Sequence, residues 1–481
     1  MSRRNGGIVG PVNRPVGGFV AGSASGVWRM NDVLTFVSNN QWPKGPENIE
    51  NSCIFNDNDS PNLSRTPSSA SSRTTWTWSA WIKRSNITGG QMVLFGAKAD
   101  SSNDTGIWFE SDETLKFFNN VGGTVKQIRT NALFRDISAW YHVVAVWDSS
   151  NSTAGDRMRL YINGVEVTSF GTDTNPGDGD ESTINSTVIH QIGRVDSTYH
   201  FDGYLAEVVF VDWQALDASS FGEFNTASGI WTPKKIGQFA NAGINSFYLN
   251  FKDSSNVGKD ESGLGNNFTV NNLTSVDQST DTCVENFATL NSLDSGTITF
   301  TDGNLTATSG SDYHATKGTI GVNTGKWYFE AKINAGSNTV DNFIGITGDN
   351  TAVTGTTYDN NPSVLYTGSG TIEKDGTTVQ SSLTTFSTGT IVGVALNMDD
   401  SEIEFYINGS KQGSTQSISS FTGSYLPFYI GANARSASFN FGAPPYSISS
   451  GNSDANGFGN FEYAVPSGYY ALNTTNLNTY G

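Results

Sequence analysis

A chain of 481 residues is long enough for two or more domains, each with its own core, and an aromatic content of 12% excludes a disordered chain. The formal net charge of −18 argues against a nucleic-acid groove, which needs surplus basic side chains, so no nucleic-acid partner is expected. Two distant cysteines exclude a disulfide framework and a cysteine-based zinc cluster, and no apolar run approaches the roughly 20 residues of a membrane span, so membrane insertion is not expected.

Residues 1–47 differ in composition from the rest of the chain. Residues 6–18 (GGIVGPVNRPVGG) cannot form a helix, and their prolines interrupt any sheet ladder. This pattern predicts an extended arm that becomes ordered against a partner or against the body of the chain. The other interpretation is a disordered terminus. Five basic and three acidic residues within the first 50 suit docking on an acidic partner, although scattered charges on a tail explain them equally well.

Short strands separated by turns follow from about residue 50 to residue 233. Residues 76–80 (WTWSA) alternate with a period of two, and 143–147 (VVAVW) are an apolar run typical of a buried strand. Residues 158–162 (MRLYI) alternate again and lead into Asn163-Gly164. An Asn-Gly pair after an apolar run predicts a tight hairpin, since both residues tolerate positive φ.

A second region of short strands separated by turns covers residues 289–442. In 327–333 (WYFEAKI), residues 327, 329, 331 and 333 share one face of a strand, and Tyr328, Glu330 and Lys332 share the other. An apolar run at 391–396 precedes an alternating strand at 403–407 and a second Asn-Gly pair. The order of these elements repeats that of the first region.

These patterns predict an all-β chain with two jelly-roll-like antiparallel β-sandwiches in tandem behind an extended N-terminal arm. The predicted parts are an arm, a first sandwich, a connecting segment with at least one strand, a second sandwich and a C-terminal tail, over residues 1–47, 48–233, 234–288, 289–442 and 443–481. The strand predicted at 247–251 (FYLNF) fits the edge of either sandwich.

No catalytic constellation stands out in the sequence. Glu402 and Glu404 fall on one strand face about 7 Å apart, a spacing within the range of glycosidase carboxylates. They occupy the face opposite the apolar residues of that strand, which predicts solvated side chains. The four histidines are isolated from one another and from any nucleophile motif, and His142, before a buried strand, is interpreted as a core residue. A non-enzymatic protein is therefore expected.

Two segments resemble known domain families. Residues 48–233 resemble laminin-G/pentraxin-like, concanavalin-type domains in the segments 78–82 (WSAWI), 161–164 (YING), 201–210 (FDGYLAEVVF) and 215–217 (ALD). Residues of the second region resemble a SPRY domain in the segments 325–330 (GKWYFE), 344–346 (IGI), 392–395 (VGVA), 405–409 (FYING) and 425–429 (YLPFY). The first resemblance implies a sandwich that can bind ligands at its rim. The second implies a sandwich that binds partners through loops at one end and is not an enzyme.

The remaining segments resemble virion structural proteins of tailed bacteriophages. The similar residues are 24–28 (ASGVW), 247–251 (FYLNF), 266–272 (NNFTVNN), 286–291 (NFATLN) and 466–473 (PSGYYALN). This resemblance implies a fibre, decoration or tail-adhesion component, assembled in the host cytoplasm and anchored to other virion proteins through residues 1–47. A homotrimer that binds host-surface glycan or protein is expected. The alternative is a virion-associated polysaccharide depolymerase of the glycosidase type on the same scaffold.

The laminin-G resemblance also implies a calcium ion held by loop oxygens at the rim of the first sandwich. The expected ligands cluster in one Gly- and Asn-containing loop and are Asp173, Asp178, Asp180 and Glu181. Asp100 and Asp104 form a second, weaker cluster. The other interpretation of the loop is an acidic, solvated turn without a metal, so calcium is the single cofactor considered.

Aromatic residues in loops and on outward strand faces are candidates for stacking against sugar rings. The candidates are Trp108, Tyr199, Trp213, Tyr358 and Tyr366. For each of them the alternative is burial in one of the two cores.

Overall fold

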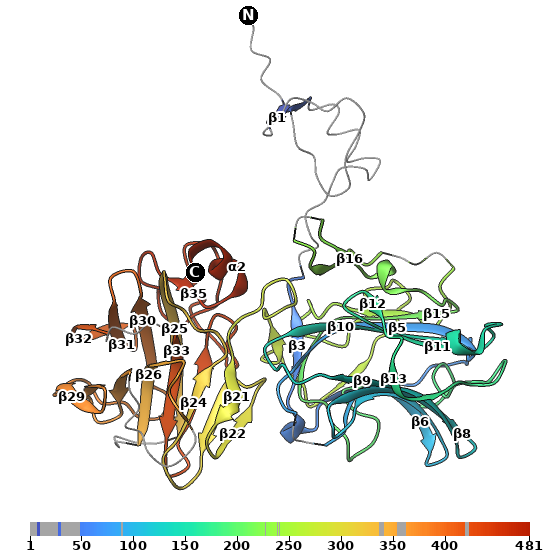
Figure 1. Ribbon diagram of the computed structural model, residues 1–481, viewed down its shortest axis with the longest axis horizontal. Helices are drawn as coiled ribbons and strands as arrows, with labels where there is room; N and C mark the ends of the chain where they lie inside the picture. The colour runs from blue at the N-terminus through green and yellow to red at the C-terminus, as the bar shows by residue number, and fades with distance from the viewer. Residues whose placement is uncertain are drawn as a thin grey trace, which may run out of the picture.

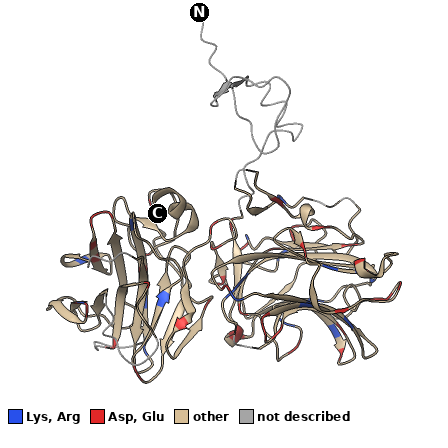
Figure 2. Ribbon diagram, in the orientation of Figure 1, with Lys and Arg blue, Asp and Glu red and all other residues tan. Residues whose placement is uncertain are grey.

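Two β-sandwiches lie side by side in the computed structural model of the chain (Figure 1). The structure describes residues 7–9, 27–29, 49–87, 90–226, 228–237, 239, 241–335, 341–353, 362–418 and 423–481. The prediction of two antiparallel sandwiches in tandem is confirmed over these residues. Figure 2 shows Lys and Arg interspersed with Asp and Glu along both sandwiches.

The first sandwich consists of two eight-stranded sheets. One sheet has the order β12 (Val165–Glu166), β11 (Met158–Ile162), β10 (Trp140–Asp148), β5 (Thr75–Arg84), β15 (Gly203–Asp212), β3 (Ser52–Phe55) and β20 (Gln278–Ser279), with β18 (Phe247–Leu249) paired to β15. The other has the order β13 (Phe170–Thr174), β9 (Thr124–Leu133), β8 (Thr114–Val121), β7 (Asn103–Phe109), β6 (Met92–Asp100), β14 (His190–Ile192), β4 (Asn62–Arg65) and β19 (Thr269–Asn271). A separate hairpin pairs β16 (Gly222–Phe224) with β17 (Trp231–Pro233), and short 3₁₀ turns occur at η1 (Asp57–Asp59), η2 (Ala154–Asp156) and η3 (Ala218–Ser220).

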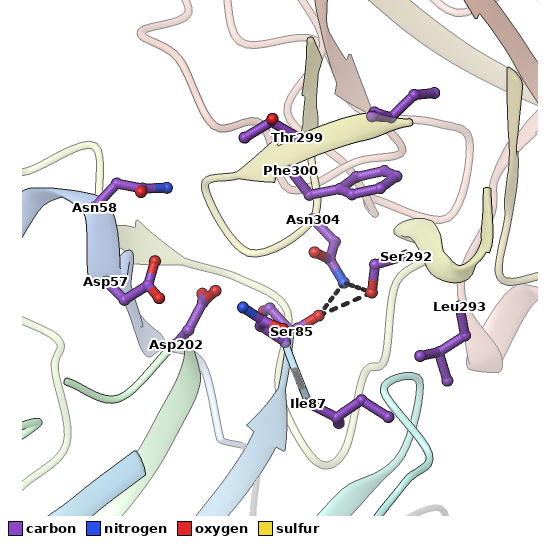
Figure 3. A pocket seen from close by; sticks show the side chains of 12 residues that line it. Asp57, Asn58, Ser85, Ile87, Asp202, Ser292, Leu293, Thr299, Phe300 and Asn304 are labelled. Atoms are coloured by element: carbon purple, nitrogen blue, oxygen red, sulfur yellow. Dashed lines mark hydrogen bonds between the residues drawn. The ribbon is translucent and has the colours of Figure 1, made fainter. Parts of the chain in front are cut away.

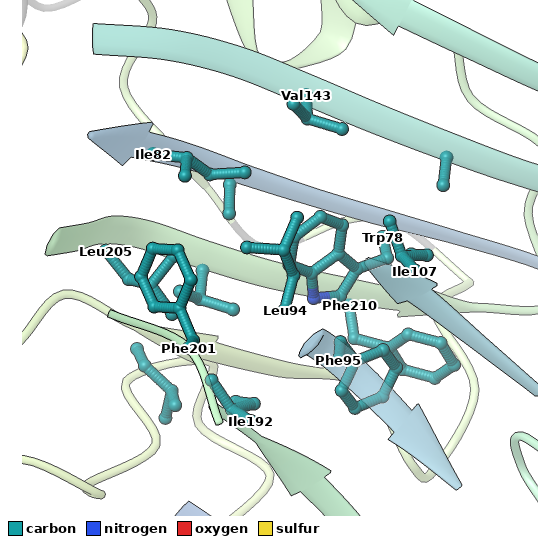
Figure 4. Packing of buried hydrophobic residues seen from close by; sticks show 14 of the residues in the cluster. Trp78, Ile82, Leu94, Phe95, Ile107, Val143, Ile192, Phe201, Leu205 and Phe210 are labelled. Atoms are coloured by element: carbon teal, nitrogen blue, oxygen red, sulfur yellow. The ribbon is translucent and has the colours of Figure 1, made fainter. Parts of the chain in front are cut away.

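Alternating side chains of β5 form the centre of the first core (Figure 4). Trp76 and Trp78 are fully buried between the sheets, and the ring of Trp78 stacks on that of Phe95 at 6.1 Å. The opposite face of β5 is also buried, because residues of η3, β17 and β18 cover this sheet from outside. The strand is therefore enclosed on both faces.

The second sandwich has a seven-stranded and an eight-stranded sheet. The first has the order β21 (Leu290–Ser295), β24 (His314–Gly318), β33 (Tyr425–Gly431), β26 (Asn342–Gly348), β27 (Ser363–Thr367), β28 (Ile372–Lys374) and β29 (Thr377–Gln380). The other has the order β22 (Ile298–Thr301), β23 (Thr306–Ser309), β34 (Ser436–Asn440), β25 (Lys326–Ala335), β30 (Ile391–Asn397), β31 (Glu402–Ile407) and β32 (Ser410–Ser417), with β35 (Tyr470–Ala471) paired to β25.

Residues 443–481 pack on the outside of this second sheet. Strand β35 pairs in parallel with β25, and helix α2 (Thr474–Tyr480) follows it with Asn473 as its N-cap. As a result Tyr328 and Glu330, on the face of β25 opposite the core, are buried as completely as Trp327 and Phe329. The segment predicted as a tail thus forms a third layer.

The segment 234–288 contributes three strands to the first sandwich. Strand β18 pairs with β15, β19 with β4, and β20 with β3. The sequence left open which sandwich receives the strand near residue 247, and the pairing places it on the first.

Both Asn-Gly pairs form tight hairpins, as predicted. Asn163 and Gly164 have φ of 48° and 82°, and Asn408 and Gly409 have φ of 48° and 77°. Positive φ at both central residues matches the right-handed twist of the flanking strands.

Within the first 48 residues the structure describes only β1 (Gly7–Val9) and β2 (Val27–Arg29), which pair with each other. The predicted extended arm over residues 1–47 otherwise lies outside the described residues. No helix among the described residues is both long and apolar enough to cross a bilayer.

Candidate functional site: a tryptophan groove

An open groove of about 420 Å³ lies on the first sandwich where helix α2 approaches it. Three tryptophans line it: Trp81 of β5, Trp140 of β10 and Trp231 of β17. The other lining residues are Asn163, Phe224, Ile230, Cys283, Asn286 and Thr474. None of the lining residues carries a formal charge. Trp140 and Trp231 are partly exposed, whereas Trp81 is buried at 4% exposure and forms the floor of the groove.

Close contact with two glycines and a histidine fixes the indole of Trp231. A Cβ atom added to Gly164 would lie 2.2 Å from this ring, and one added to Gly222 would lie 2.5 Å from it. The indole Nε1 donates a hydrogen bond to Nδ1 of His142 at 3.0 Å. The Asn-Gly hairpin therefore turns the chain and also leaves room for the tryptophan.

His142 is a neutral, buried support for this ring. Because indole Nε1 can only donate, Nδ1 of His142 accepts, and Nε2 carries the proton toward Ser79 Oγ at 2.9 Å. Burial lowers the pKa of His142 to about 3. The interpretation of His142 as a core residue agrees with this environment.

The rim of the groove exposes apolar side chains of the β16–β17 hairpin. Phe224 is 50% exposed and Ile230 is 64% exposed, while the ring of Phe224 contacts that of Trp231 edge-on at 4.9 Å. Large exposed apolar groups beside a concave aromatic surface are typical of interaction sites. The groove can hold the apolar face of a sugar ring or an apolar side chain of a partner.

The predicted aromatic site residues do not converge. Trp108 and Tyr366 are buried, so the prediction that they bind at the surface is wrong; Trp108 packs on Phe118, and Tyr366 belongs to the second core. Tyr199 is partly buried against the cluster of Trp108. Trp213 is 61% exposed and donates to Ser71 Oγ, away from the groove, and Tyr358 lies outside the described residues.

The predicted calcium loop is not a metal site formed by its carboxylates. Asp173 accepts from the side chain of Asn175, Asp180 from the backbone N–H of Gly177, and Glu181 pairs with Arg73. Each of these three carboxylates thus has a partner within the protein, and Asp178 is exposed in the same loop. Over the described residues, no three His, Cys, Asp or Glu side chains are grouped so that they could hold a metal ion.

The carboxylates of the second acidic cluster, Asp100 and Asp104, also accept hydrogen bonds from neighbouring residues. Asp100 accepts from Ser102 and Asn103, and Asp104 accepts from Asn120. A turn contact thus holds the carboxylate of Asp100, and a cross-strand contact between β7 and β8 holds that of Asp104.

Glu404 has contacts that do not suit a general acid. Partial burial acts to raise its pKa, but hydrogen bonds from Lys411, Thr415 and Tyr406 outweigh burial and lower it. Its neighbour on that face, Glu402, is exposed. A Glu404 carboxylate that is ionised and accepts several hydrogen bonds lacks the raised pKa that a general acid needs to protonate a glycosidic oxygen.

Comparison with known proteins agrees with the two sandwiches. Residues 57–220 match the concanavalin A-like lectin/glucanases superfamily, and residues 326–444 match the SPRY domain. The chain carries a concanavalin A-like domain before a SPRY domain. Both are β-sandwich folds typical of binding modules. Of the residues that line the groove, Trp81, Trp140 and Asn163 lie within the concanavalin A-like match, and the others lie beyond it in the chain.

Two solved structures resemble parts of the chain. The SPRY domain of human HERC1 is 15% identical, with 31% of this chain and 96% of that chain covered and a TM-score of 0.27. A native heptameric SAP-like pentraxin from Limulus polyphemus is 22% identical, with 35% of this chain and 79% of that chain covered and a TM-score of 0.27. No curated protein matches the sequence.

Proposed function

We propose that this chain is a non-enzymatic binding protein that engages cell-surface glycan, or protein, through the tryptophan groove of its first sandwich. The observation that carries the proposal is the convergence of Trp81, Trp140 and Trp231 on one open, uncharged groove. Aromatic rings pack well against the C–H faces of sugars, and amide and hydroxyl groups at the border can bind sugar hydroxyls. The family name of the first domain, which joins lectins and glucanases, supports a carbohydrate ligand.

The rigidity of the groove also favours binding. The ring of Trp231 is confined by Gly164, Gly222 and His142, so little side-chain entropy is lost when a ligand contacts it. A role without catalysis is favoured by the contacts of Glu404, the carboxylate that the sequence brought nearest to a glycosidase arrangement.

The proposal is tested by glycan-panel binding of the full chain, the variant Trp231→Ala and the control Trp213→Ala. Removing the Trp231 ring is expected to weaken binding by about 5-fold to 150-fold, if the ligand gains from the ring about the 1–3 kcal/mol that a nucleic-acid base gains from stacking on an aromatic side chain. Trp213 is exposed outside the groove, so its removal should leave the affinity unchanged. Unchanged binding by a folded Trp231→Ala variant would refute the groove, and release of reducing ends from a bound polysaccharide would refute the non-enzymatic role.

We further propose that the chain is a virion component, a fibre, decoration or tail-adhesion protein repeated as a homotrimer. Support comes from the sequence segments that resemble tailed-bacteriophage virion proteins. Two of these segments connect or add to the sandwiches. Residues 286–291 lead from the first sandwich into β21, and residues 466–473 contain β35. In this role residues 1–47 attach the body to other virion proteins.

Deletion of residues 1–47 tests the anchor. The truncated chain is expected to remain folded, because the described residues of both cores all come after residue 48, and to be absent from purified particles. Circular dichroism checks the fold, and immunoblotting of particles from complementation checks incorporation. Particles that contain the truncated chain at the normal level would show that the anchor lies elsewhere.

A further inference from the structure

A cavity of about 270 Å³ lies between the two sandwiches (Figure 3). The first sandwich contributes Asp57 of η1, Ser85 after β5 and Asp202 before β15, and the second contributes Phe300 of β22 and Asn304. Among the described residues that line it, none is Lys, Arg or His. The cavity therefore holds two carboxyl groups without a basic side chain in its wall.

Asp202 has a buried oxygen without a partner. Its side chain is almost fully enclosed, and Oδ1 makes no hydrogen bond, as is also true of Oγ of Ser85. Figure 3 shows the carboxyl groups of Asp57 and Asp202 directed toward one another at one side of the cavity. An unpartnered buried carboxylate is costly, so such a group is expected to take up a proton or a cation.

The surrounding charges increase this cost. Burial raises the pKa of Asp202 well above its usual value, and the negative charges of Asp57 and Asp302 raise it further, against a smaller opposing effect of Arg84. Burial also raises the pKa of Asp57, and a hydrogen bond from the backbone N–H of Asn58 and, to a smaller extent, the nearby His200 partly offset this rise. The guanidinium of Arg84 donates to the carbonyl of Phe134 and does not hydrogen-bond to Asp202.

Neutral oxygens complete the wall. Nδ2 of Asn304 donates to the carbonyl of Ser85 at 2.6 Å and to Oγ of Ser292 at 3.3 Å, which leaves Oδ1 of the same amide for another partner. The cavity thus combines two carboxylates, an amide oxygen and the hydroxyl of Ser85. Hard oxygens from several separate segments are the ligand type of Ca²⁺, which accepts irregular geometry, whereas Mg²⁺ demands a near-ideal octahedron.

We propose that this cavity binds a calcium ion that bridges the first and second sandwiches, with Asp57 and Asp202 as its charged ligands. The bound ion neutralises the paired carboxylates and joins η1 and the start of β15 to the loop that carries Asn304. Its ligands come from both sandwiches, and none of them belongs to the loop at residues 173–181. The proposal is independent of the tryptophan groove.

Calorimetric titration of EDTA-treated full chain with CaCl₂ near pH 7 tests it, together with thermal unfolding with and without calcium. We expect one site per chain and a higher Tm with calcium. Asp202→Asn and Asp57→Asn should each lose binding by at least about tenfold. The matched control Asp178→Asn removes one carboxylate from the exposed loop and should bind like the wild type. Binding should weaken as the pH falls, because protons compete for Asp202.

Four results would overturn the proposal. The first is that titration with CaCl₂ releases or absorbs no heat of binding and calcium does not change the Tm. The second is unchanged calcium binding by a folded Asp202→Asn variant, and the third is loss of calcium binding in Asp178→Asn. The fourth is tighter binding of MgCl₂ than of CaCl₂. If the Tm rises on acidification and does not change when calcium is added, the carboxyl pair holds a proton and not a calcium ion. Because Asp202→Asn keeps the shape of the side chain and removes its buried charge, circular dichroism should confirm that this variant folds.

Discussion

Replacing Lys83 with methionine is expected to lower the free energy of unfolding by about 3–5 kcal/mol, because it leaves a buried carboxylate without its cation. Lys83 and Asp281 form an ion pair at 2.8 Å with side chains only 1% and 2% exposed. The ammonium also donates to Oδ1 of Asn286 at 2.7 Å and to the carbonyl of Phe287 at 3.3 Å. These acceptors lie where the chain passes from the first sandwich to the second, so the loss should also loosen the junction.

Urea unfolding monitored by tryptophan fluorescence measures this change. The control is Lys252→Met, which breaks an exposed pair with Glu50 and should cost less than about 1 kcal/mol. In a second comparison, Lys83→Met combined with Asp281→Leu should recover much of the lost stability, since no charge then remains buried. A loss below about 1 kcal/mol for Lys83→Met alone would contradict the buried pair.

Replacing Glu330 with alanine should cost at least about 3 kcal/mol, because several buried donors lose their acceptor together. The carboxylate is fully buried and accepts from the backbone N–H of Glu462 at 3.0 Å and of Tyr463 at 2.9 Å. It also accepts from the hydroxyl of Tyr328 and the amide of Asn440. These bonds fasten residues 443–481 to the outer face of β25.

Hydrogen exchange distinguishes this effect from a general loss of stability. Amides of residues 443–481 should exchange much faster in Glu330→Ala, while those of the first sandwich should keep their wild-type rates. Glu402→Ala, at an exposed position of β31, is the control and should change stability by less than about 0.5 kcal/mol. Equal protection of the C-terminal segment in Glu330→Ala and the wild type would show that other contacts hold it.

The strands could be predicted because each has a local signature. The alternation at 76–80 and 327–333 and the two Asn-Gly pairs depend on residues close in sequence, and the structure forms strands and hairpins at these positions. The burial of Tyr328 and Glu330 could not be predicted, since it depends on a covering segment more than 100 residues later that has little periodicity. A polar residue on an outward strand face reads as solvated until such a layer is known.

The groove could not be predicted for a related reason. Its tryptophans come from β5, β10 and β17, and only the sheet register, which places His142 opposite Trp81, brings these elements together. Asn163-Gly164 was recognisable as a hairpin, but nothing local indicates that its glycine makes room for Trp231. The sequence around Trp108 predicts a surface aromatic residue, but in the sheet the ring of Trp108 packs on that of Phe118.

Hydroxyl-radical footprinting of the chain with and without a glycan that it binds tests the tryptophan groove most directly. Trp231 and Phe224 should be oxidised more slowly when the glycan is present, because a ligand in the groove covers both rings. Trp213, exposed elsewhere on the same domain, should be oxidised at the same rate in both samples. Protection of Trp213 with unchanged oxidation of Trp231 and Phe224 would place the ligand outside the groove and contradict the proposed function.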